Sequence, residues 1–508
     1  MSKNMKDNTS TESIIKHIVD KVKIFAHANY KEEWINSSTD LYSNLRLSEN
    51  EIIALLIDLE KDYNVDMDSI PIKSKPSFKI GYIASIVEHS NDIVEEGYEK
   101  KLLTYALDNV VSYKKWYRSD KITRILDIDW EGDYHKGNEY DSISLPYYAC
   151  YSYGGLIQRR VLNANGEYCF TLKTLTEKLI SELPLWRKRR SWYGISPDDK
   201  HVSFVTFNYI GNRLALPMNK EIISEKGSEL IIFESAVNYN TANYYLDAIK
   251  EFSPKWIIGN CSILYNLCLC ILEMKYNMQE IKYVEIEANN IPSEEMLETM
   301  RKAFRGAKVA VSVTNPHKGP YLITCPEGHL HPIGNSTLIY SKNVLSSQND
   351  NNGYYNLFLS SFVNISAPVI NVDSYVRGII IQGNNCIYCQ ENNQTVKLAP
   401  TCNFNGFIDK NNWYISAELI KMCVDLVNSE YNNPFSALQI LQTKQNSVKL
   451  FLKKMDKFKN WEDVLTDSLL SYLNTWASNT IEFELIMLDE MNPCEYTGVL
   501  SYFQNHSI

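Results

Sequence analysis

Four residues of this 508-residue chain combine the types and spacing of a metal site. Cys325 and His331 form Cys-x5-His, and Cys386 and Cys389 form Cys-x2-Cys further along the chain. Thiolate and imidazole donors in this number suit tetrahedral Zn²⁺, and four protein ligands would close the site, which favours a structural role over a catalytic one. His329 is an alternative ligand, and buried thiols with a surface histidine are the alternative explanation.

A basic segment, Trp186-Arg187-Lys188-Arg189-Arg190-Ser191-Trp192, places four cations between two tryptophans. Arg187, Lys188, Arg189 and Arg190 predict a docking surface for an acidic partner domain, since charge complementarity steers association. A solvated basic turn is the alternative.

The N-terminal fifth of the chain is acidic and is predicted to be helical. Residues 1–98 hold 11 Lys and Arg against 17 Asp and Glu, a net charge of −6 out of −10 for the whole chain. Three apolar stripes at helical spacing predict three helices. They consist of Ile14, Ile18 and Val22, then Ile52, Leu55, Leu56 and Leu59, then Phe78, Tyr82, Ile83 and Ile86.

The remainder of the chain mixes helical patterns with short apolar, β-branched runs, which predicts an α/β body. These runs are Val202–Phe207, Leu230–Phe233, Lys255–Ile258, Tyr283–Ile286 and Val309–Val313. Residues 415–475 are predicted to be mostly helical, and the alternation in Ile481–Leu488 predicts a strand, so the chain should end in a small α/β subdomain.

Charge and composition exclude several classes of protein. The net charge of −10 argues against broad binding of nucleic acid or of anionic membranes, since both need basic surface. Trp256–Leu272, the most apolar stretch, is interrupted by asparagines and is too short to span a bilayer, so it is predicted to lie in the core. Eleven cysteines and a polar start indicate a cytoplasmic protein with reduced thiols.

The segment Asp40–Met67 resembles the central part of acyl carrier proteins, and Leu59–Tyr63 matches that family's LExxF-like ending. In the family, a serine at the start of the acidic helix receives phosphopantetheine. The alignment places Glu49 at that position, and Ser48 is the residue before it. Modification of Ser48 is one prediction. The other is a capping box, Ser48-x-x-Glu51, at a helix start. The acidic helix, including Glu49 and Glu51, is the second predicted docking surface.

Three further stretches resemble adenylate-forming ligases of the phenylacetate–CoA ligase type. They are Ala248–Tyr265, Met300–His331, and Pro368–Ile370 followed by the Cys-x2-Cys pair. The resemblance implies an α/β adenylate-forming (ANL-type) body with a small C-terminal α+β lid, preceded by the all-α carrier-like domain. The implied domains are 1–88, a linker 89–100, a core 101–402 and a lid 403–508, and some relatives carry zinc at positions corresponding to the cysteines.

The chemistry of adenylation needs groups that this sequence replaces. In the resemblance, the phosphate loop retains Gly155 alone, the Mg²⁺ carboxylate becomes His317, and the conserved Arg and ribose-binding Asp become Asn371 and Val376. The family's C-terminal lysine also has no counterpart, because no Lys or Arg follows Lys459. Phosphate and Mg²⁺ binding, and the stabilisation of charge that adenylation requires, therefore lack their usual groups.

These observations predict a catalytically degenerate ligase homologue that binds or assists a carrier protein, or its modifying enzyme, in polyketide or fatty-acyl biosynthesis. ATP, Mg²⁺ and phosphopantetheine are not expected as cofactors, whereas structural zinc is. The alternative is a working ligase that activates an acid with ATP and transfers it to CoA or a carrier thiol, with Asp373 or a shifted serine taking over a missing role.

Overall fold

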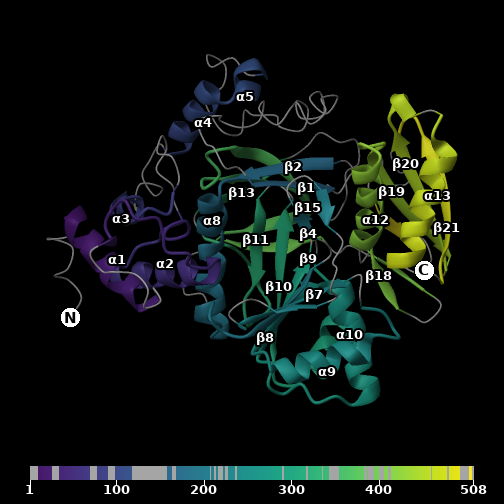
Figure 1. Ribbon diagram of the computed structural model, residues 1–508, viewed down its shortest axis with the longest axis horizontal. Helices are drawn as coiled ribbons and strands as arrows, with labels where there is room; N and C mark the ends of the chain where they lie inside the picture. The colour runs from purple at the N-terminus through teal and green to yellow at the C-terminus, as the bar shows by residue number, and fades with distance from the viewer. Residues whose placement is uncertain are drawn as a thin grey trace.

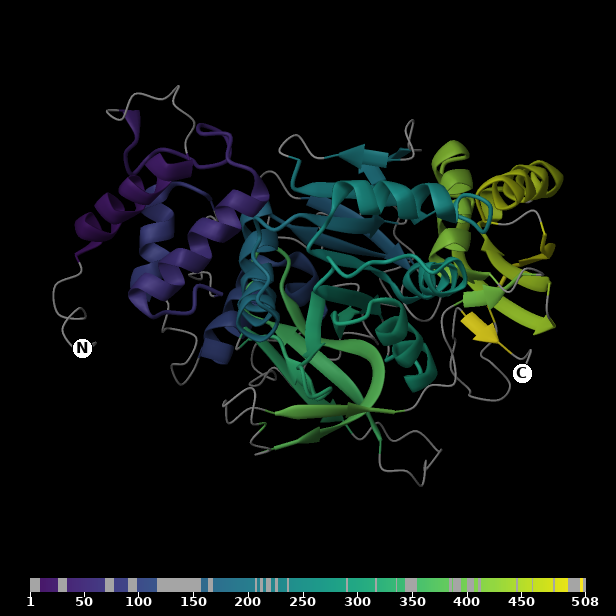
Figure 2. The same cartoon turned by 90° about the horizontal axis from the view of Figure 1, so that it is seen from below.

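The computed structural model describes residues 10–25, 34–68, 77–89, 98–116, 157–162, 168–205, 208–210, 213–215, 221–223, 227–234, 237–288, 291–315, 318–334, 336–342, 354–382, 386, 394–399, 406–409, 413–444, 446–458, 460–477, 480–491 and 503–505. A helical N-terminal module and a C-terminal subdomain lie at opposite ends of a central body, as both views show (Figure 1 and Figure 2). The body is built on one large sheet.

The N-terminal module contains the three predicted helices, α1 (Thr11–Phe25), α2 (Glu49–Tyr63) and α3 (Ile80–His89). All three apolar stripes face its core. A capping box begins α2, and Asn64, in the left-handed conformation, ends it. Six consecutive residues of α2, positions 52 to 57, are buried, which requires cover on every side of the helix. The module covers one side of α2 and the body covers the other.

Two helices connect the module with the body. His89 is the last residue of α3, and Tyr98 begins α4 (Tyr98–Asn109), which leads into α5 (Val111–Trp116). The predicted linker 89–100 is therefore helical at both of its ends, and residues 90–97 lie outside the described ranges. The buried hydroxyl of Tyr113 donates a hydrogen bond to the carbonyl oxygen of Pro368, which ties α5 to the body.

A twelve-stranded mixed sheet forms the body, in the order β13-β14-β15-β16-β12-β11-β10-β9-β8-β3-β7-β6. Its strands are β3 (His201–Val205), β6 (Glu221–Ile223), β7 (Glu229–Phe233), β8 (Trp256–Asn260), β9 (Tyr283–Ala288), β10 (Lys308–Asn315), β11 (Gly319–Thr324), β12 (Leu330–Pro332), β13 (Thr337–Lys342), β14 (Tyr355–Ser361), β15 (Val369–Ile381) and β16 (Thr395–Leu398). Two small hairpins, β1 (Ile157–Leu162) with β2 (Tyr168–Lys173) and β4 (Asn208–Ile210) with β5 (Arg213–Ala215), accompany the sheet.

Strands β7, β3, β8, β9 and β10 are parallel neighbours, in the order 7-3-8-9-10. The direction of chain progression reverses between β3 and β8, which makes their carboxyl ends a topological switch point, the usual ligand position in such sheets. Each parallel strand coincides with one of the apolar runs singled out in the sequence. The helices are α8 (Leu175–Lys188) with the π-helical turn η5 (Arg189–Tyr193), α9 (Ala242–Phe252), α10 (Cys261–Met274) and α11 (Glu294–Ala303).

The C-terminal subdomain differs from the sequence-based expectation. It contains a small pair, β17 (Gly406–Ile408) and β18 (Tyr414–Ser416), then α12 (Ala417–Glu430), β19 (Phe435–Lys444), β20 (Ser447–Lys454), η7 (Asp456–Phe458), α13 (Glu462–Tyr472), η8 (Leu473–Ala477), β21 (Glu482–Leu488) and β22 (Phe503–Asn505). The mostly helical prediction for 415–475 is wrong over 435–454, where β19 and β20 form an antiparallel hairpin. The predicted strand at Ile481–Leu488 is confirmed as β21.

Among the described helices, none is long and apolar enough to cross a membrane. Trp256–Leu272 is divided between strand β8 and helix α10, and the side chains of Cys261, Cys268 and Cys270 are buried there. The stretch thus belongs to the core of the body, as predicted.

Candidate metal centre and module interface

A tight turn between β11 and β12 brings the first two metal candidates together. Cys325 directly follows β11, and Gly328, at φ 81°, lets the chain reverse so that His331 lies in β12. The backbone N–H of Cys325 donates to the carbonyl oxygen of His329 at 2.8 Å. Cys386 approaches the turn from beyond β15, whereas Cys389 lies outside the described residues.

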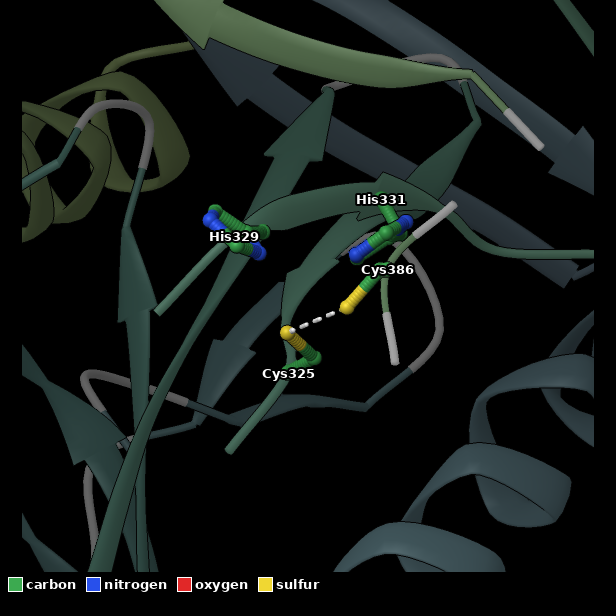
Figure 3. A group of neighbouring side chains, drawn as sticks. All are labelled: Cys325, His329, His331 and Cys386. Carbon is green, nitrogen blue, oxygen red and sulfur yellow. Dashed lines mark hydrogen bonds between the residues drawn. The ribbon is translucent and has the colours of Figure 1, made fainter. Parts of the chain in front are cut away.

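The ligand atoms of Cys325, His329, His331 and Cys386 all lie within 4.8 Å of one another. The two sulfur atoms are 3.7 Å apart and face each other (Figure 3). Two sulfurs bound to one tetrahedral zinc at about 2.3 Å each would be separated by about 3.8 Å. The observed separation fits a shared metal, and it is much longer than the roughly 2.05 Å of a disulfide bond.

The environment of Cys325 also fits a metal ligand. Burial and the neighbouring Cys386 thiol raise the pKa of its thiol above the usual value, and hydrogen bonds from the backbone N–H groups of Glu327 and His329 oppose part of that rise. Amides that point at a sulfur stabilise the thiolate form, which is the form that binds zinc. His331 is buried, and its ring packs edge-on against Trp192 with centroids 5.7 Å apart. The cluster therefore contacts the end of the basic segment.

Two of the four predicted docking cations belong to the body and do not face outward. Arg189 is buried, and its guanidinium donates to both carboxylate oxygens of Glu285 at 2.7 and 2.8 Å. It also lies 4.5 Å from the ring of Trp186. Lys188 is buried with its ammonium 4.7 Å from the Trp192 ring. A solvated basic turn does not describe these two side chains.

The other two cations face the N-terminal module, where α2 packs against α8 (Figure 1). Arg187 lies among three carboxylates, forming ion pairs with Glu60 at 3.6 Å, with Asp66, and with Asp68 at 3.2 Å. Arg190 pairs with Asp58 of α2 at 3.5 Å. The two predicted docking surfaces, the basic segment and the acidic helix, therefore contact each other within one chain.

The start of α2 lies at the same interface. Glu49, at the position of the carrier family's modified serine, forms an ion pair with Lys178 of α8 at 2.6 Å. The capping box is confirmed, because the Glu51 N–H donates to the Ser48 hydroxyl and the Ser48 N–H donates to the Glu51 carboxylate at 2.8 Å. Glu51 therefore serves the helix start, and modification of Ser48 stays a prediction.

Of the four positions that the resemblance aligns with the adenylation groups, the two described ones, Asn371 and Val376, both lie on β15. Gly155 and His317 lie outside the described residues. Asn371 is buried in β15 at φ 54°; its side-chain oxygen accepts a hydrogen bond from Tyr340, and its N–H donates to the Ser360 hydroxyl at 2.8 Å.

Val376, on the same strand, has a buried isopropyl group. A buried amide and an isopropyl group carry neither the cation nor the carboxylate that the resemblance implies at these positions.

The sequence reasoning missed a polar network at the switch point. Glu234, which follows β7, is buried and accepts hydrogen bonds from Asn260 at 2.5 Å and from Ser416 at 2.6 Å. Asn260 also caps α10, accepting the Ile263 N–H at 3.1 Å. Ser416 is the N-cap of α12, so the network joins the sheet to the C-terminal subdomain. A lone glutamate after an apolar run was the only available signal.

Comparisons with known proteins find a likeness in fold. No protein-family profile matches the chain, and no curated protein matches its sequence. The structure, however, has the fold of adenylate-forming CoA ligases.

One such enzyme is 2-hydroxyisobutyryl-CoA ligase in complex with 2-HIB-AMP and CoA; it is 11% identical, with a TM-score of 0.50 over 83% of this chain and 90% of that one. An amide bond synthetase from Marinactinospora thermotolerans is more distant, at 6% identity and a TM-score of 0.38 over 67% of each chain. These similarities concern the fold alone.

Proposed function

We propose that this protein is a catalytically degenerate homologue of acid–CoA ligases of the phenylacetate–CoA ligase type, which binds or assists a carrier protein, or its modifying enzyme, in polyketide or fatty-acyl biosynthesis. The observation that carries the proposal is which residues occupy two positions of strand β15. The strand positions that should hold an arginine and a ribose-binding aspartate hold Asn371, whose amide is hydrogen-bonded inside the sheet, and Val376, which is buried.

The physical argument concerns charge. Adenylation creates negative charge on phosphate, and a protein lowers the barrier with fixed cations, backbone amides and a carboxylate-bound Mg²⁺. Neither β15 residue can carry charge, and the acidic segment after Lys459 would repel phosphate. The fold would then serve as a scaffold, because a fold does not determine chemistry.

A structural zinc ion is the second part of the proposal. Cys325, Cys386 and His331 would supply three ligands, and His329 or Cys389 would supply the fourth. A closed tetrahedral site holds segments together and leaves no position for a substrate. Zinc would fix the β11–β12 turn against the residues that follow β15, and through Trp192 it would support η5.

Titration calorimetry with Mg-ATP up to millimolar concentration tests the proposal. We expect neither heat of binding nor a rise in melting temperature, while 2-hydroxyisobutyryl-CoA ligase, titrated in parallel, serves as a positive control. Specific ATP binding by the chain, followed by acid-dependent pyrophosphate exchange, would refute degeneracy.

That result would support the alternative, a working acid–thiol ligase. One observation favours it: Asn315, at the carboxyl end of β10, donates to the carbonyl oxygen of Asp373 at 3.1 Å, which places a carboxylate-bearing residue next to that edge of the sheet. In a working ligase, Asp373 would take over a metal- or ribose-binding role, and Asp373→Asn would abolish exchange.

A further inference from the structure

Ion pairs join α2 to α8 near both ends of the two helices. Glu49 and Lys178 pair near the first turns of their helices, while Asp58 and Glu60 pair with Arg190 and Arg187 near the far ends. The first turns of the two helices therefore lie together and so do their far ends, where the pairs cross, because Asp58 precedes Glu60 while its partner Arg190 follows Arg187. At 1.5 Å per residue, the paired stretch of α2 is about 15 Å long.

The ion pairs at the edges of this contact remain exposed to solvent. The exposed fractions are 40% for both Lys178 and Glu49, 45% for Arg190 and 39% for Asp58. Exposed pairs contribute little to affinity, whereas they do set register and partner choice. The edge pairs therefore select an acidic helix by the spacing of its charges, while the pairs of Arg187 with Glu60 and Asp68 are buried at their carboxylates.

The basic side of the contact consists of Lys178, Arg187 and Arg190 on α8 and η5, which we call the α8 face. We propose that the α8 face is the docking site for the acidic helix of a separate carrier protein, and that the chain's own N-terminal module is its resident occupant, which must leave before the carrier protein binds. The choice of a carrier protein as partner rests on the proposed function.

The α8 face presents cations that an acidic helix can pair with. Its three cations receive five carboxylates from the module, and α2, which supplies three of them, also has buried apolar residues between its charges. The occupant holds its acidic groups on one helix and on the segment that directly follows it. A partner that replaces it needs an acidic helix with apolar residues between the charges.

The test uses full-length chains with charge reversals on the module. In the release variant, Glu49→Lys, Asp58→Lys and Asp66→Lys oppose the α8 face while altering only exposed carboxylates. The matched control carries three charge reversals away from the α8 face, Glu12→Lys and Asp20→Lys on α1 and Glu88→Lys on α3.

Hydrogen exchange reports whether α2 has left α8, and calorimetry measures the affinity for a holo acyl carrier protein of fatty-acid synthesis. We expect faster exchange in both helices and carrier binding tighter by about tenfold or more in the release variant, because an occupied face reduces apparent affinity by its free fraction. The control should match the parent. Unchanged exchange, or released helices without a gain in binding, would overturn the proposal.

A second measurement separates this proposal from the proposed function. A variant with Lys178→Glu and Arg190→Glu keeps an intact acidic module but has a reversed face. When the two variants are mixed, the module of the reversed-face variant should bind the unoccupied α8 face of the release variant. Analytical ultracentrifugation should then detect a mixed dimer. A dimer without carrier binding would retain the docking site and reject the carrier protein as partner; no dimer and no carrier binding would reject the docking site itself.

Discussion

The stability of the module should depend on pH through one buried carboxyl group, that of Glu60. Its side chain is 5% exposed; one oxygen accepts the Met67 N–H at 2.8 Å, and the other lies 3.6 Å from the Arg187 guanidinium. Burial raises the pKa of Glu60 from its usual 4.5 to about 7, against the opposing effects of Arg187 and the Met67 amide. Asp68 and Asp66 contribute to this rise, because three carboxylates share one guanidinium.

The sign follows from proton linkage. The folded state holds the proton of Glu60 more tightly than the unfolded state does, so its contribution to stability is complete below about pH 4.5 and is lost as pH rises through about 7. At about 1.4 kcal/mol per unit of pKa difference, the loss amounts to about 3 kcal/mol.

Glu60→Gln removes the titration and retains an oxygen that can accept the Met67 N–H. We expect the variant and the parent to have similar stability near pH 5, and the variant to be more stable by up to about 3 kcal/mol near pH 8. Hydrogen exchange of the α2 amides, corrected for the intrinsic effect of pH, measures this local free energy of opening. Asp58→Asn, which removes an exposed charge from the same helix, is the matched control.

The test is how the difference in stability between the variant and the parent changes with pH. Other titrating groups contribute equally to both proteins, so their contributions cancel in this difference. A difference that is constant from pH 5 to 8 would refute the reasoning. A variant that is less stable than the parent at pH 8 would show instead that the ion pair with Arg187 outweighs the cost of burying the Glu60 carboxylate.

Three other predictions concern the metal centre, the basic segment and the helix start. Cys386→Ser should reduce the zinc content, measured by mass spectrometry of the metal, from about one ion per chain to a small fraction of that, whereas Cys270→Ser, in α10, should leave it unchanged. Arg189→Met should destabilise the body by about 3–5 kcal/mol, because it leaves the buried Glu285 carboxylate without its guanidinium partner. Arg190→Met, which removes an exposed ion pair, should destabilise it by less than about 1 kcal/mol. Denaturant unfolding measures both losses of stability, and equal losses in the two variants would contradict the burial argument. Ser48→Ala should cost about 1 kcal/mol through the lost cap, and treatment of the parent with CoA and a phosphopantetheinyl transferase should give no mass increase.

Local patterns determined much of the fold. The capping box at Ser48 was readable because its donor and acceptor lie three residues apart, and the parallel strands were readable because both of their faces are buried. The hairpin β19–β20 was not readable in this way. Leu, Lys and Gln in Phe435–Lys454 also suit a helix, and β20 pairs with β21, whose residues lie 35 positions later in the sequence.

The sequence also predicted which residues would carry charge and which would bind metal, while the tertiary structure decided where they meet. Cys325 and His331 share one turn, but the approach of Cys386 and the position of His329 depend on the packing of distant strands. The acidic helix and the basic segment were both predicted to bind a partner. Charge complementarity carries no information on whether that partner is another protein or another part of the same chain. Packing determines what each cation contacts in the structure: Arg189 turns inward to Glu285, and Arg187 turns toward the carboxylates of the module.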